Sequence, residues 1–239
     1  MGSFGTRCSF ELYHSTNVFR LRTSYIVFCV ITFWTTLIFR SSLYAQSDDG
    51  CILRRDQDSI RVFTCHAENS QFKSVRASFT VNTTFSQLAS MVMDIRGYNR
   101  WQYNTINPRI LKRFGNREIL YYVEVKAPWP ISNRDMIIHL TMEQDSVTKT
   151  MTITANGEPN YLPIKEGIIR VPMSQSTWIV KSVGKNKLAV NYAIQIDPGG
   201  SVPAWMVNMV SADAPHTSYK NFREQIHQHT IDSSMLIRD

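Results

Sequence analysis

The 239-residue chain lacks the short motifs that mark many catalytic sites. It contains no HExxH zinc motif, no nucleophile elbow and no glycine-rich phosphate loop. Its six histidines do not stand at metal-ligand spacing with cysteine. We therefore expect a protein that is not an enzyme and that uses neither a metal ion nor a cofactor.

Basic clusters and repeats are also missing. No group of Lys and Arg with interleaved aromatic residues appears, which argues against nucleic acid as a partner. The chain after the first 45 residues contains no internal repeat, no low-complexity tract and no linker. This part of the sequence therefore predicts one domain, residues 46–230, followed by a tail at 231–239.

The longest apolar run, residues 25–39, falls short of the roughly 20 residues that cross a bilayer comfortably. It follows Arg20 and Arg22 and precedes a stretch of small residues that ends at Ala45. This order is typical of a secretory signal peptide, so we predict cleavage after Ala45 and export to the periplasm or the extracellular space. The alternative is a membrane anchor, uncleaved, formed by residues 25–39.

Loss of the leader changes the charge of the protein. The net charge falls from +7 for the whole chain to +4 for the remainder, which is mildly basic. Such a domain is attracted weakly to an anionic membrane surface. We expect a monomer that makes transient contact with a membrane surface.

Only two cysteines, Cys51 and Cys65, remain after the leader. They flank the sequence ILRRDQDSIRVFT, which predicts a hairpin that turns at residues 56–59 and places the two cysteines nearly opposite each other. In an exported protein this arrangement favours a disulfide. The alternative is a pair of free thiols in an edge hairpin.

Alternating apolar residues predict a series of further strands. These cover residues 72–81, 109–114, 117–126, 134–144, 149–155, 167–173, 177–183 and 187–196. With the hairpin they make one antiparallel sheet that is apolar on one side. Only two substantial helices, near 84–95 and at the end of the domain, are available to cover that side, so the sheet can enclose a cavity.

The last helix has a distinct sequence. Pro198, Gly199 and Gly200 end the preceding strand, because proline lacks a ladder donor and glycine accepts the angles of a tight turn. An apolar stripe at helical spacing follows, and Pro215 is expected to kink the helix. The stripe comprises Trp205, Met206, Met209 and Val210.

Three segments resemble one family. APWPISNRD, residues 127–135, is similar to the PWP-to-RD segment of START domains, the lipid-transfer domains related to the steroidogenic acute regulatory protein. DPGGSVPAWMVNMVSADAPHTSYKNFREQI resembles their C-terminal helix, and ILRRDQDSIRVFT their opening hairpin. The resemblance covers about residues 51–226 and indicates a secreted bacterial-type member.

The resemblance implies an α+β helix-grip fold. In this fold a curved antiparallel sheet wraps around a long C-terminal helix and encloses a hydrophobic tunnel. Members mostly bind a single lipid or sterol-like ligand and carry or sense it, with the terminal helix as a lid. The alternative function is that of a cyclase-like or hydrolase-like enzyme of the same superfamily, with an acid–base pair in the same cavity.

Candidate ligand-binding residues follow from strand and helix faces. Arg134 shares a face with Met136 and Ile138 and would need a carboxylate or phosphate partner if buried, whereas Asp135 points to the opposite face and is expected to anchor a turn or strand edge. The full predicted set for the ligand is Tyr121, Arg134, Met136, Ile138, Tyr192, Trp205, Met206, Met209 and Val210. The predicted hinge residues of the lid are Gly199, Gly200 and Pro215.

Overall fold

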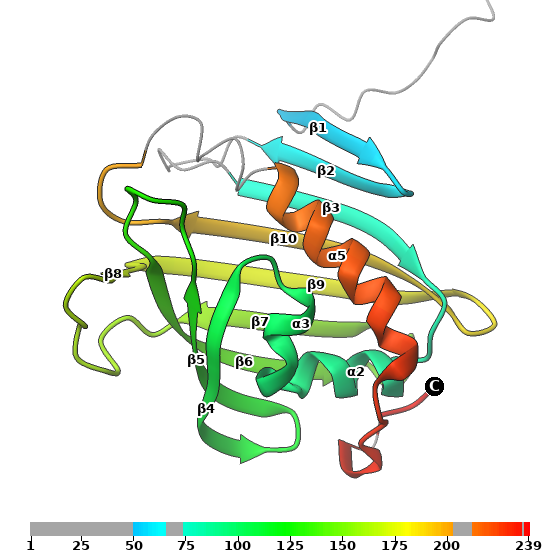
Figure 1. Ribbon diagram of the computed structural model, residues 1–239. Coiled ribbons are helices and arrows are strands. Elements are labelled where there is room, and N and C mark those ends of the chain that lie inside the picture. The colour runs from blue at the N-terminus through cyan, green and yellow to red at the C-terminus, as the bar shows by residue number, and fades with distance from the viewer. Residues whose placement is uncertain (1–49, 66–73, 203–211, 236) are drawn as a thin grey trace, which may run out of the picture. The chain divides into compact units, whose positions relative to one another are not determined.

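Ten β-strands form one sheet, and the helices pack on a single face of it (Figure 1). The computed structural model describes residues 50–65, 74–202, 212–235 and 237–239, which belong to one compact unit, Asp48–Asp239. The strands are β1 (Cys51–Gln57), β2 (Ile60–Cys65), β3 (Ser74–Val81), β4 (Thr105–Gly115), β5 (Glu118–Val125), β6 (Arg134–Gln144), β7 (Met151–Gly157), β8 (Ile169–Arg170), β9 (Met173–Gly184) and β10 (Lys187–Asp197).

The strand order across the sheet is β1-β2-β3-β10-β9-β7-β6-β5-β4, with antiparallel neighbours throughout. The short strand β8 lies off this path and pairs in parallel with the start of β6. The predicted strand at 167–173 is therefore reduced to two residues. Pro172 contributes to this break, because it has no N–H group to continue the ladder.

The first hairpin turns through Asp58 and Ser59, which both have positive φ angles, 53° and 56°. This is the backbone conformation that matches a two-residue turn to the twist of the flanking strands. Opposite the turn, Cys51 pairs with Cys65 in the strand register and is joined to it by a disulfide. The hairpin is thus closed at both ends.

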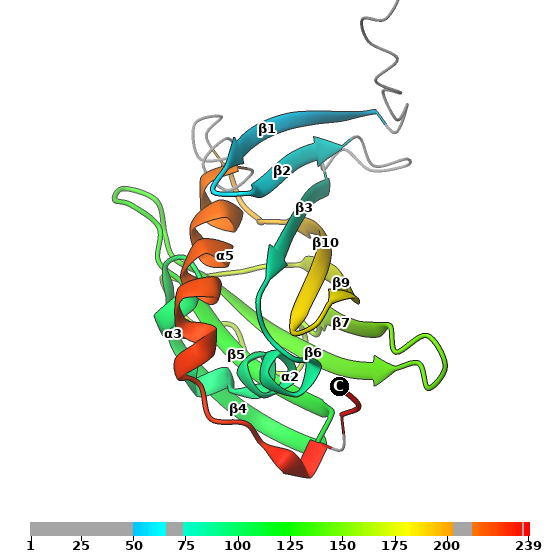
Figure 2. The same ribbon diagram turned by 90° about the vertical axis from the view of Figure 1, so that its right-hand side faces the viewer.

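Two helical regions cover the concave face of the sheet (Figure 2). The first consists of α2 (Phe85–Met93), the 3₁₀ turn Ile95–Gly97 and α3 (Tyr98–Trp101); the second consists of α5 (Ala214–Gln225) and the 3₁₀ turns Ile226–Gln228 and Ser233–Met235. The side chain of Thr84 accepts a hydrogen bond from the backbone N–H of Gln87 and so caps the start of α2.

Aromatic side chains attach α5 to the sheet. Tyr219 stacks on Phe79 with ring centroids 4.6 Å apart, and Phe222 packs against Trp101 and Trp178 at 5.2 and 5.9 Å. Phe222 is fully buried, and large aromatic rings contribute much of the apolar area in such a core. The curved sheet around a C-terminal helix is the α+β helix-grip architecture that the sequence predicts.

The hairpin turn also contacts the start of α5. Arg55 forms an ion pair with Asp213 at 2.5 Å, and the buried ring of His216 lies 3.3 Å from the carbonyl oxygen of Gln57. Pro215 occupies the first turn of α5, where the missing N–H costs the helix little. The predicted kink involves residues 203–211 as well, and these lie outside the described residues.

The predicted tail packs on the domain. Met235 is buried, the side chain of Arg117 donates to its carbonyl oxygen at 2.8 Å, and Gln144 exchanges two hydrogen bonds with the backbone of Arg238. Within the part of the chain that the structure describes, no helix is both long and apolar enough to cross a membrane. The predicted leader, residues 1–45, lies outside that part.

Candidate ligand-binding cavity

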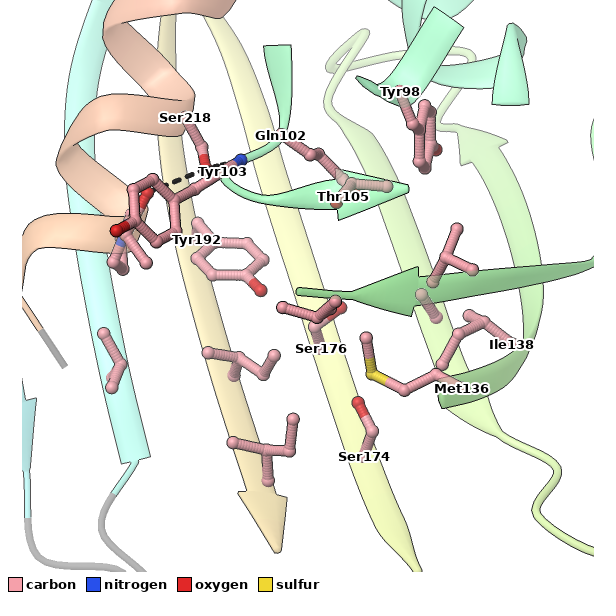
Figure 3. A pocket seen from close by; sticks show the side chains of 18 of the residues that line it. Tyr98, Gln102, Tyr103, Thr105, Met136, Ile138, Ser174, Ser176, Tyr192 and Ser218 are labelled. Carbon is pink, nitrogen blue, oxygen red and sulfur yellow. Dashed lines mark hydrogen bonds between the residues drawn. The ribbon is translucent and has the colours of Figure 1, made fainter. Parts of the chain in front are cut away.

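A cavity of about 270 Å³ lies between the concave face of the sheet and α5 (Figure 3). Strands β3, β5, β6, β7, β9 and β10 contribute its wall, and α3 and the first turns of α5 lie on the other side. Its lining is mainly aliphatic and aromatic. An apolar space of this kind suits a hydrophobic small molecule.

The structure brings together the predicted strand residues. Alternation places Tyr121, Arg134, Met136, Ile138 and Tyr192 on the inner face of β5, β6 and β10, and all five line the cavity. Pro215 lines it from α5. The other four predicted residues, Trp205, Met206, Met209 and Val210, lie outside the described residues.

Gly199 and Gly200 form a turn beside the cavity. Both have positive φ angles, 66° and 64°, which favour glycine. A Cβ atom on Gly199 would also lie only 3.1 Å from side-chain atoms of Ile169 and Pro172. Glycine is therefore required at this turn for its backbone angles and for its close contact with the neighbouring loop.

Sequence reasoning missed several lining residues. Tyr98 and Trp101 follow the first helix in a short aromatic segment whose sequence does not indicate where the rings point. Tyr219 lies in the last helix, downstream of the apolar stripe from which the predicted residues were taken. Trp178, Ser174 and Ser176 share the inner face of β9, because residues two positions apart on a strand point to the same side. This periodicity of two could have identified all three.

Four fully buried tyrosines of the cavity remain uncharged at neutral pH. Burial is the main cause that raises the pKa of Tyr98, Tyr121, Tyr192 and Tyr219 above the ordinary value of tyrosine. The hydroxyl of Tyr98 donates to the carbonyl oxygen of Val92 at 2.6 Å. These groups can act as neutral hydrogen-bond donors or acceptors, but they are poor general bases at neutral pH.

Arg134 is the most unusual polar group of the lining. It is 4% exposed, and burial lowers the pKa of its guanidinium. Nη1 donates to the carbonyl oxygen of Ser132 at 2.6 Å, and Nη2 donates to that of Gly199 at 3.4 Å. Nε has no hydrogen-bond partner among the described residues, and no carboxylate there forms an ion pair with this side chain.

Asp135 lies on the opposite face of β6, as predicted, and it anchors the neighbouring short strand β8. Its buried carboxylate receives Nε and Nη2 of Arg170 at 2.7 and 3.0 Å. The same guanidinium donates to the carbonyl oxygens of Pro159, Leu162 and Pro163. Asp135 and Arg170 therefore fix the loop before β8 against the outer face of the sheet.

Glu124, on the same outer face, is the centre of a second polar cluster. Burial alone would raise its pKa, but hydrogen bonds from Lys165, Tyr122 and Asn107 outweigh this and lower the pKa to about 2. The three distances are 2.8, 2.6 and 2.8 Å. The cluster holds the loop before β8 and lies outside the cavity.

Among the described lining residues, none is Asp, Glu or His, whereas Lys126 and Arg134 are cationic. The described residues also assemble no group of three or more His, Cys, Asp or Glu side chains that could hold a metal ion. The cavity thus combines apolar walls with positive charge.

The family model of the START domain matches residues 44–230, most of the chain. The chain belongs to the START domain family. A solved STAR-related lipid transfer protein from Xanthomonas axonopodis superimposes with a TM-score of 0.68 at 27% identity, over 75% of this chain and 100% of that one. The fold described above is therefore shared with a bacterial STAR-related lipid transfer protein.

Two curated proteins are similar in sequence to this chain. An uncharacterized protein of Pseudomonas aeruginosa is 28% identical over 171 residues, which are 72% of this chain and 84% of that protein. The phosphatidylcholine transfer protein of Rattus norvegicus is 30% identical over 127 residues, 52% of this chain and 58% of that protein. The START domain described here thus aligns with little more than half of the rat protein.

Proposed function

We propose that this START domain binds a single lipid or sterol-like molecule in its cavity and carries or senses it. The observation that carries the proposal is the cavity of about 270 Å³ between the sheet and α5, with aliphatic and aromatic walls. The relatives named for lipid transfer support the same class of ligand.

The proposed ligand would leave the cavity only toward another apolar environment. Burial of each methylene stabilises by about 0.8 kcal/mol, so a chain of about 15 methylenes gains about 12 kcal/mol. Release into water would be correspondingly slow. Transfer therefore requires a membrane or a partner protein that accepts the ligand.

The proposed membrane contact is the loop that contains Trp129. This side chain is 93% exposed, and the neighbouring residues Lys126 and Ala127 line the cavity. Tryptophan favours the interface between water and lipid, and lysine is attracted to anionic head groups. Trp129 thus lies close to the route that a ligand would take between membrane and cavity.

The proposed lid is the terminal helix, of which Ala214, Pro215, Ser218 and Tyr219 contact the cavity. Its described start is attached to the first hairpin by polar contacts such as Arg55 to Asp213, which are weaker than apolar packing. Gly199 and Gly200 are the proposed hinge, because glycine tolerates the largest changes of backbone angle.

A carrier agrees with the cavity better than an enzyme does. An acid–base pair needs two ionisable groups close together, and the described lining contains no carboxylate or imidazole. Its buried tyrosines have raised pKa values and stay protonated. We further propose export to the periplasm or extracellular space as a monomer, for which the disulfide between Cys51 and Cys65 is the supporting observation.

Native mass spectrometry of the protein purified from its host and after incubation with lipid vesicles tests the proposal. We expect one lipid molecule per chain and transfer of that lipid to acceptor vesicles. A protein that carries no lipid and acquires none from phospholipid or sterol-containing vesicles would contradict the function.

A matched pair of variants links the lipid to the cavity. Ser176 lines the cavity, and Thr177, its neighbour on β9, faces the other side of the sheet. Ser176→Phe should fill part of the cavity and reduce lipid loading several-fold, whereas Thr177→Phe should leave loading unchanged. Equal loading of both variants would place the ligand elsewhere on the protein.

A further inference from the structure

Arg134 is a buried cation whose charge is not matched inside the protein. Its guanidinium has five N–H donors, and two of them make the hydrogen bonds to Ser132 and Gly199. The second of these bonds is long, at 3.4 Å, and Nε is buried without a partner among the described residues. Burial of an unpaired guanidinium costs free energy, and an anion that accepts its hydrogen bonds offsets this cost.

The surroundings of Arg134 favour an anion that arrives with the ligand. The described lining of the cavity contains Lys126 as a second cation and no acidic side chain. Ser174 and Ser176 add hydroxyl groups from β9 to the same lining (Figure 3). Arginine is the side chain best suited to carboxylate and phosphate groups, because its planar donors match two acceptor oxygens.

We infer that the ligand is an anionic lipid whose carboxylate or phosphate oxygens bind Arg134 while its chain occupies the apolar part of the cavity. The inference rests on the proposed function and adds the chemical class of the head group. An ester, alcohol or sterol lacks the negative charge and would leave Arg134 unmatched. The same chain with and without its charge should therefore differ strongly in affinity.

Two pairs of lipids with identical chains test the inference. The first pair is oleate and methyl oleate, and the second is dioleoylphosphatidic acid and dioleoylglycerol. Binding is measured by the fluorescence of the cavity residues Trp101 and Trp178 and by native mass spectrometry. The charged member of at least one pair should bind roughly 10- to 100-fold more tightly, because hydrogen bonds to a charged group are the strong ones.

The source of the anion follows from the same measurements. A preference for oleate alone identifies a carboxylate, and a preference for phosphatidic acid alone identifies a phosphate. Inorganic phosphate is added as a third probe and should neither quench the fluorescence nor displace the lipid. Binding of inorganic phosphate with an affinity equal to that of phosphatidic acid would overturn the inference, because the site would then bind the free anion.

Variants assign the preference to Arg134. Arg134→Met should bind the neutral lipids as the wild type does and lose the preference for the charged ones. Lys181→Met is the control, since it removes a charge of the same sign from an exposed position of β9 that does not line the cavity, and it should retain the preference. A preference that survives Arg134→Met, or that disappears in Lys181→Met, would overturn the assignment.

The outcomes also distinguish a failure of the anionic-ligand inference from a failure of the proposed lipid binding. Equal binding of charged and neutral lipids by the wild type would refute the anionic ligand and leave the lipid carrier intact. Failure to bind any of the four lipids would refute the anionic ligand, and failure to acquire any lipid from phospholipid or sterol-containing vesicles would refute the function as well. If Arg134→Met does not fold, the wild-type selectivity between charged and neutral lipids still decides whether the ligand is anionic.

Discussion

Two buried arginines lie on opposite faces of the same sheet and have opposite surroundings. Arg170, on the outer face, is 9% exposed and binds both oxygens of Asp135 and three carbonyl oxygens. Arg134, on the cavity face, is 4% exposed and binds two carbonyl oxygens. The hydrogen bonds that Arg170 donates to Asp135 raise the pKa of Arg170, and burial lowers the pKa of Arg134.

The difference separates a structural charge from a functional one. On the outer face the protein supplies its own anion, and the ion pair fixes a loop. On the cavity face the described residues supply no anion, and Nε of the Arg134 guanidinium has no hydrogen-bond partner among them. Incomplete satisfaction of a buried polar group is rare in proteins, which makes the cavity arginine the more informative of the two.

The largest effect on stability is expected from Arg170→Met. The substitution leaves the carboxylate of Asp135 buried at 1% exposure without its partner. Removal of one member of a buried ion pair typically costs about 3–5 kcal/mol in the free energy of unfolding. Urea unfolding monitored by circular dichroism measures it. The double variant Asp135→Asn with Arg170→Met should recover part of the loss, and a single-variant loss below about 1 kcal/mol would contradict the structural role of this pair.

A smaller effect is expected from Glu124, and it should depend on pH. The folded protein holds the pKa of Glu124 at about 2, below the ordinary value of 4.5. The stabilising contribution is therefore complete above pH 4.5 and is lost as the pH falls through 2. Urea unfolding at several pH values should show this loss in the wild type. Glu124→Gln should be less stable at pH 7 and lose less stability in acid; an unchanged acid profile would remove Glu124 as its cause.

The smallest effect on stability is expected from Arg134→Met. No buried carboxylate is left behind, and the two lost hydrogen bonds to carbonyl oxygens together contribute about 1–3 kcal/mol, offset by relief of the buried charge. We expect a net change within about 1 kcal/mol, measured by the same urea unfolding. A loss as large as that of Arg170→Met would abolish the contrast between the two faces.

The sequence predicted the two faces correctly because strands alternate with a period of two. That rule alone places Arg134 inside with Met136 and places Asp135 outside. It could not identify Arg170 as the partner of Asp135. Arg170 follows an irregular loop that begins at Glu158, and no periodicity in such a loop indicates where a side chain points.

The terminal helix shows a second limit. A proline within an apolar stripe predicts a kink; Pro215 stands in the first turn of α5, and the kink stays a prediction because residues 203–211 lie outside the described residues. The same helix contributes Tyr219 to the cavity, a residue that nothing in the sequence distinguishes from its neighbours. Helical spacing identifies a face, whereas the structure shows which part of that face meets a cavity.

The pairing of β3 with β10 has a consequence for how the chain folds. Val81 lies opposite Leu188, so the wall of the cavity joins strands from the beginning and the end of the domain. The ion pair between Arg55 and Asp213 spans 158 positions of the sequence. Contacts over such separations slow folding, because a long loop must close before they form. The β1–β2 hairpin can form as soon as its residues are made, but the chamber between sheet and helix exists only when almost the whole domain is available.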